Sequence, residues 1–87
     1  MHQIQEELLE QLADENPEAL LAAGFENAIL GICERFGQPP LIAYDYGKCI
    51  QILMKDMTEE EAVEYFEYNT LGAWVGENTP VFVRTMP

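Results

Sequence analysis

The stretch "NAILGICERFGQPPLIAYD", residues 27–45, decides the fold class of this chain. It holds two apolar, β-prone runs, residues 28–33 and 41–44, on either side of "RFGQPP". The Gly and Pro residues of that segment are typical of a turn or short loop, so the stretch predicts a β-hairpin. Both strands are apolar on both faces, which predicts that helices cover at least one side. A helix over residues 27–36, ending at Gly37, is the alternative that periodicity leaves open.

The segment before the hairpin has a helical pattern. Over residues 1–16, apolar side chains recur every four positions, and carboxylates recur at the same interval on the opposite side. The apolar set is Ile4, Leu8 and Leu12, and the carboxylates are Glu6, Glu10 and Asp14. This pattern predicts an amphipathic helix. Asn16 as an N-cap, Pro17 at the first helical position and Gly24 as a stop then predict a second short helix, or a kinked continuation of the first.

The segment after the hairpin predicts two helices and a strand. Asp45 is a suitable N-cap for a helix over residues 46–57. Thr58 and Glu61 have the spacing of a capping box, which opens the next helix. The closing "PVFVR", residues 80–84, predicts a third strand.

These elements together predict an α+β fold. We expect a small antiparallel three-stranded sheet packed against three or four helices, in the order α-(α)-β-β-α-α-β. Eighty-seven residues make one domain, residues 1–87, with a modest core over residues 25–83. The sequence allows the acidic helix over residues 1–16 to lie at the periphery of the domain.

The charge of the chain narrows the classes of partner. Sixteen acidic residues against four basic ones give a net charge of −12, whereas a magnitude of about 2–8 serves a small soluble domain. Two acidic blocks, residues 1–26 and 56–77, contain no lysine or arginine. Direct binding to nucleic acid or to an anionic membrane is disfavoured, because both repel such a surface. A basic protein or a cation is the natural complement.

The second acidic block places its charges on one helix. With 100° per residue, Ala62, Val63, Phe66 and Thr70 share the core side. Glu60, Glu64 and Glu67 cluster on the far side, with Tyr68 at its flank. We predict that these four residues, with Glu6, Glu10 and Asp14, bind a partner. A merely solvated face is the competing interpretation.

The sequence offers little for catalysis or for metal binding. The one histidine, His2, lies in a terminal segment, and Cys33 and Cys49 read as buried, reduced thiols. The chain lacks the four Cys/His ligands of a zinc site and any phosphate-binding or serine-elbow motif. We therefore expect no enzyme activity, no cofactor and no metal. Trp74 is interpreted as a core residue, with ligand binding as the alternative.

Two features of the sequence indicate where in the cell this protein is located. The N-terminus is polar and acidic, without the apolar segment of a secretory signal. No apolar run approaches the roughly 20 residues that span a bilayer. The expectation is a cytoplasmic protein.

Two stretches carry a resemblance to a known family. "AYDYGKCIQILM" and "EEAVEYFEYNTLGAWVGENTPVFV" resemble a family of small acidic proteins found in bacteriophage and bacterial genomes. The likeness covers residues 25–83 and leaves the acidic segment 1–16 outside. The family has no settled activity, so it implies context only: an accessory protein of a virus or mobile element in a bacterial cell.

Three functional hypotheses follow. The first is a binding module that presents carboxylate-lined helices to a basic host protein, as an inhibitor or nucleic-acid mimic of the anti-CRISPR kind. The second is an assembly subunit that forms a homo-oligomer through the apolar segment 27–55, without catalytic activity. The third, weaker hypothesis is a small-ligand binder that uses Trp74, Tyr44, Tyr46 and Tyr68.

Overall fold

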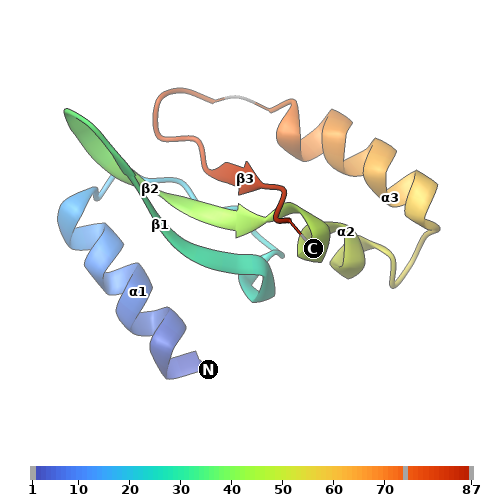
Figure 1. The fold of residues 1–87 in the computed structure, drawn as a ribbon, viewed down its shortest axis with the longest axis horizontal. Coiled ribbons are helices and arrows are strands. Elements are labelled where there is room, and N and C mark those ends of the chain that lie inside the picture. Colours follow the sequence, from blue (N-terminus) through green and yellow to red (C-terminus); the bar gives the residue numbers. More distant parts are fainter. Residues whose placement is uncertain (1, 74, 87) are drawn as a thin grey trace.

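The computed structural model describes residues 2–73 and 75–86 and shows an α+β fold (Figure 1). The elements follow one another as α1 (His2–Glu15), a 3₁₀ turn η1 (Glu26–Ala28), β1 (Ile29–Arg35), β2 (Gln38–Asp45), α2 (Tyr46–Leu53), α3 (Glu59–Phe66), a π-helical turn η2 (Glu67–Leu71) and β3 (Val81–Val83). The predicted fold class and the hairpin are confirmed, and the helical alternative for residues 27–36 is wrong.

The sheet is mixed, whereas the sequence predicted an antiparallel one. Strands β1 and β2 pair antiparallel, but β2 and β3 pair parallel, with Tyr44 opposite Phe82. The strand order is β1-β2-β3. The reason is the connection: α2 and α3 carry the chain back along the sheet, so that β3 starts at the same end as β2, as in any crossover connection.

The helix predicted after Asn16 is absent. Residues 16–25 form turns and extended chain, and Gly24 adopts a left-handed φ of 93°. The Asn16 side chain does accept a hydrogen bond from the Glu18 backbone N–H at 3.2 Å, as a cap would. Its amide group, however, donates to the Pro40 carbonyl at 2.8 Å, which holds this segment against β2 and draws it away from a helical path.

The two predicted helix starts after the hairpin are confirmed. Asp45 caps α2 by accepting a hydrogen bond from the Lys48 N–H at 3.0 Å. Thr58 and Glu61 form a reciprocal capping box, with hydrogen bonds of 2.9 and 3.2 Å. These side chains satisfy backbone N–H groups that the first turn of a helix leaves without a partner.

The core gathers around Phe66 of α3, which is fully buried. Its ring makes edge-to-face contacts with Phe25, Tyr46 and Phe82, at centroid distances of 5.1–5.6 Å. Tyr44 of β2 stacks on Phe82, and its hydroxyl accepts a hydrogen bond from the Ala22 N–H. Aromatic pairs of this kind add to the free energy gained from burial. They attach α3 and the segment before η1 to the sheet.

Helix α1 packs against the hairpin through Leu12, which is buried, and the neighbouring Leu8 and Leu9. Figure 1 shows α1 below the β1–β2 hairpin, while α2 and α3 lie near the carboxyl end of β2, on the other side of the molecule. The two acidic helices are therefore held apart by the sheet.

Candidate functional site

The carboxylates of α3 are exposed because of what the opposite side of the helix buries. Ala62 and Phe66 pack into the core, which turns Glu60 and Glu64 to solvent. The capping box occupies Glu61. The hydrogen bond that its carboxylate accepts from the Thr58 N–H, and then the Thr58 side chain, lower the pKa of that carboxyl group. The predicted exposure of this helix face is thus observed.

One side of α3 is acidic. A shallow hollow of about 350 Å³ is lined by Glu59, Glu60, Val63, Glu64 and Glu67. Within the part of the chain that the structure describes, no lysine or arginine forms an ion pair with Glu60, Glu64 or Glu67. Glu60, Glu64 and Glu67 are predicted partner-binding residues, and Glu59 is the member of this group that the sequence did not predict. We call this surface the α3 acidic face.

Among the described residues, Glu67 is the one member of the α3 acidic face with a hydrogen bond to a distant side chain. Its Oε2 accepts a hydrogen bond of 2.8 Å from the Tyr46 hydroxyl. Partial burial, then the contact with Glu67, raises the pKa of Tyr46, so the phenol stays protonated and donates. The Arg84 guanidinium lies 5.9 Å from the centroid of the same ring. An arginine, a phenol and a carboxylate thus already meet at the edge of this face.

Tyr68 stands beside the α3 acidic face and is 85% exposed. It lies in the π-helical turn that continues α3, which is closed by a hydrogen bond of 3.0 Å from the Gly72 N–H to the Glu67 carbonyl. The structure thus leaves this predicted partner-binding residue accessible.

The carboxylates of α1 form a separate surface. Glu6, Glu10 and Asp14 are exposed on the side of α1 that faces away from the buried Leu12. Because α1 packs on the hairpin and α3 packs on α2, the two carboxylate sets do not meet (Figure 1). The seven predicted residues therefore belong to two faces, which one small basic surface cannot cover together.

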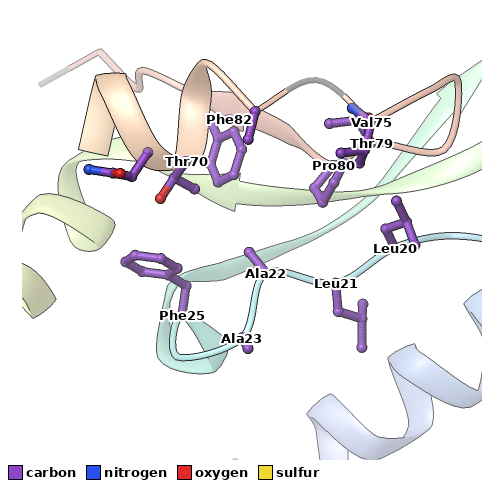
Figure 2. Close-up of a pocket in the computed structure, with 12 residues that line it drawn as sticks. Leu20, Leu21, Ala22, Ala23, Phe25, Thr70, Val75, Thr79, Pro80 and Phe82 are labelled. Carbon is purple, nitrogen blue, oxygen red and sulfur yellow. The ribbon is translucent and has the colours of Figure 1, made fainter. Parts of the chain in front are cut away.

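A second hollow, of about 330 Å³, is mainly apolar and was not anticipated from the sequence. Figure 2 shows Phe82 and Thr70 facing Phe25 and Ala22 across it. The remaining lining residues are Leu20, Leu21, Ala23, Asn69, Ala73, Val75, Thr79 and Pro80. The sequence did not predict this hollow because residues 17–23 have the pattern of a helix. A helix there would have buried Leu20 and Leu21, which instead line the hollow.

The tyrosines proposed for ligand binding do not line this apolar hollow. Tyr44 is buried in the core, while Tyr46 and Tyr68 lie toward the α3 acidic face. Trp74 lies outside the described residues. Strand β2, helix α2 and the turn η2 thus place Tyr44, Tyr46 and Tyr68 outside the lining of this hollow, and ligand binding by these residues stays a prediction.

The two free thiols lie on different elements, Cys33 on β1 and Cys49 on α2. Burial raises the pKa of the Cys49 thiol to about 11, which leaves it almost entirely protonated at neutral pH. Cys33 is half-buried on β1. Among the described residues no three His, Cys, Asp or Glu side chains are placed to hold a metal ion. No helix in the described part of the chain is long and apolar enough to cross a membrane.

The chain was compared with known proteins at the level of sequence and of structure. The likeness of residues 25–83 to acidic phage proteins stays a prediction from the sequence. Comparison with protein-family models, with curated proteins and with solved structures found no match.

Proposed function

We propose that this protein is a small acidic binding module that docks the α3 acidic face onto a basic surface of another protein. The observation that supports it is that Glu59, Glu60, Glu64 and Glu67 lie together along one side of α3, a helix that begins with a capping box. Neighbouring carboxylates on a helix repel one another by a few tenths of a kcal/mol per pair. A cationic partner relieves this repulsion.

Long-range electrostatics point to the same class of partner. With a net charge of −12, the molecule attracts basic proteins and repels nucleic acid and anionic lipid. Charge complementarity of this kind accelerates association and makes it sensitive to salt.

The finer proposal is an inhibitor that imitates nucleic acid. Successive carboxylates one helical turn apart are spaced by about 5.4 Å along the axis, which is coarsely similar to the spacing of phosphates. The resemblance of residues 25–83 to phage and bacterial proteins favours a target in a bacterial cytoplasm. A nucleic-acid-binding groove of a host defence protein is the surface that fits both points.

A capture experiment with matched variants tests the proposal. Tagged protein is incubated with bacterial lysate and washed at low and at high salt. We expect a basic, nucleic-acid-handling protein to be retained at low salt only. Its retention should fall when Glu60, Glu64 and Glu67 are all changed to Gln, which keeps an acceptor for the Tyr46 hydroxyl.

The carboxylates of α1 supply the control. The variant with Glu6→Gln, Glu10→Gln and Asp14→Asn removes the same charge from the other side of the molecule, and it should retain the partner more strongly than the α3 variant. Equal losses in both variants would show that net charge alone governs capture. Unchanged capture by the α3 variant would refute the assignment of the docking surface.

A further inference from the structure

The apolar hollow of about 330 Å³ differs in charge from the rest of this molecule. None of the described residues that line it is acidic or basic, although 23% of the residues of the chain are charged. From its lining we infer that the hollow binds a small uncharged aromatic compound that carries one hydrogen-bonding group. The inference goes beyond the proposed function and does not depend on the α3 acidic face.

The walls of the hollow are held in place by hydrogen bonds between distant parts of the chain. The Leu20 N–H donates to the Asn78 carbonyl at 3.1 Å, and the Ala22 N–H donates to the Tyr44 hydroxyl at 2.8 Å. These bonds fix the segment before η1 relative to the sheet. Sites for small molecules are usually pre-formed in this way, with volumes of about 300–1,000 Å³. The hollow lies at the lower end of that range, so it suits a small compound.

The aromatic character of the guest follows from two phenylalanine rings. Phe25 and Phe82 both line the hollow, and they stand on opposite sides of it in Figure 2. Each also makes an edge-to-face contact with the buried Phe66, at centroid distances of 5.6 and 5.1 Å. Aromatic rings gain from edge-to-face or offset contact beyond the burial of their area. A flat ring in the hollow therefore extends this cluster with contacts to Phe25 and Phe82.

The polar groups of the lining place the hydrogen-bonding group of the guest at η2. The Thr79 hydroxyl is already engaged, since it donates to the Gly76 carbonyl at 2.6 Å. The Asn69 amide nitrogen donates to the Tyr65 carbonyl at 3.0 Å, which leaves its Oδ1 as an acceptor. Within the described part of the chain the Thr70 hydroxyl makes no hydrogen bond. Thr70 and Asn69 are thus the pair that a hydroxyl group of the guest meets.

The rim of the hollow gives the guest its driving force. Leu21 and Val75 line the hollow and are 54% and 64% exposed. Exposed apolar surface around a hollow is typical of binding sites, because a guest removes that surface from water. A second copy of the chain is a poor guest, since two molecules of net charge −12 repel each other. A charged compound is also a poor guest, because the lining offers no ion to pair with it.

The test uses p-cresol, an uncharged aromatic ring with one hydroxyl group, and the ¹⁵N-labelled full chain in an NMR titration. We expect saturable shifts of backbone amide signals that are confined to the lining residues. Three related compounds separate the features of the guest. Binding should weaken by roughly fivefold for toluene, which lacks the hydroxyl, and by roughly threefold for 4-methylcyclohexanol, which lacks the aromatic ring. It should weaken by roughly tenfold or more for p-toluate, which carries a charge.

Two variants test the residues. Thr70→Val removes the hydroxyl with little change of shape, so it should reduce the preference for p-cresol over toluene while toluene still binds. Ala22 lies across the hollow from Phe82 (Figure 2), and Ala22→Leu should abolish binding because the larger side chain fills the space. Ala13→Leu makes the same change at an exposed position of α1 that does not line the hollow, and it should leave binding unchanged.

The outcomes decide the inference without reference to the acidic faces. Shifts that do not saturate, or that spread over the whole chain, would overturn the site. Equal binding of p-toluate and p-cresol would overturn the requirement for an uncharged guest. Binding of p-cresol by a folded Ala22→Leu variant as tightly as by the native chain would place the compound elsewhere. Should that variant not fold, an undiminished preference for p-cresol in Thr70→Val would still refute the assigned orientation.

Discussion

Asn16 connects three parts of the chain through one side chain. Its amide group donates to the Pro40 carbonyl of β2 and to Oδ1 of Asn78, and its Oδ1 accepts from the Glu18 N–H. The residue is only 4% exposed, and no buried side-chain nitrogen or oxygen of the described residues lacks a partner. A buried polar group that is fully bonded specifies the fold, because any rearrangement would leave it unsatisfied.

The change Asn16→Ala should destabilise the protein by about 2 kcal/mol, because it removes three hydrogen bonds and leaves the Pro40 carbonyl without the donor that Asn16 supplies. Urea denaturation followed by circular dichroism would measure the free energy of unfolding. Asn27→Ala, at an exposed position, is the control and should change it by less than about 0.5 kcal/mol. An Asn16→Ala variant as stable as the native chain would show that the bonds contribute nothing net.

At the scale of elements, the π-helical turn η2 shapes both hollows. It extends α3, carries Glu67 and Tyr68 on one side, and presents Asn69 and Thr70 to the apolar hollow on the other. Short π-helical turns within helices are rare and occur often at functional sites. The position of Gly72 explains why the turn can close. A Cβ atom there would lie 3.0 Å from the Glu67 carbonyl oxygen and 3.1 Å from that of Tyr68.

Gly72→Ala should therefore displace the Glu67 and Tyr68 carbonyl groups by a few tenths of an ångström and cost about 1–3 kcal/mol, as overpacking against backbone does. Gly31→Ala is the matched control, because a Cβ atom at Gly31 meets nothing within 4 Å. Thermal unfolding would compare the two variants with the native chain. Equal midpoints for Gly72→Ala and Gly31→Ala would contradict the close approach.

At the scale of the whole molecule, the apolar middle segment 27–55 serves the protein's own core. The buried residues of this segment include Leu41, Ile42, Cys49 and Ile50. Three large apolar side chains of this segment remain exposed, and they lie apart in the chain: Leu30 on β1, Phe36 in the hairpin turn and Met54 just after α2. The hypothesis of a homo-oligomer that pairs through this segment therefore has little surface to use.

We expect a monomer of 9.9 kDa by light scattering at micromolar concentration, because the exposed apolar side chains of segment 27–55 are scattered and two molecules of charge −12 repel each other. Repeating the measurement at high salt, where that repulsion is screened, provides the control. A dimer under both conditions would revive the assembly hypothesis, and Leu30→Lys on the edge strand β1 would then be expected to dissociate it.

Prediction from the sequence succeeded where the signal is local. The capping box of Thr58 and Glu61, the cap at Asp45 and the exposed side of α3 all depend on residues within one or two helical turns. The hairpin follows from a turn between two apolar runs. Prediction failed at Asn16, whose local pattern indicates a helix cap, because a hydrogen bond to Pro40, 24 residues away, competes with that pattern.

The amino-acid sequence by itself determined the elements outside residues 16–25, the net charge and which carboxylates share a helix face, because these depend on local pattern and on counting. Only the tertiary structure decided that β3 runs parallel to β2, that α1 and α3 lie on different sides of the molecule, and that Tyr46 contacts both Glu67 and Arg84. Those facts depend on contacts between residues far apart in the chain. Such contacts are selected by the packing of the whole core around Phe66, which no local pattern encodes.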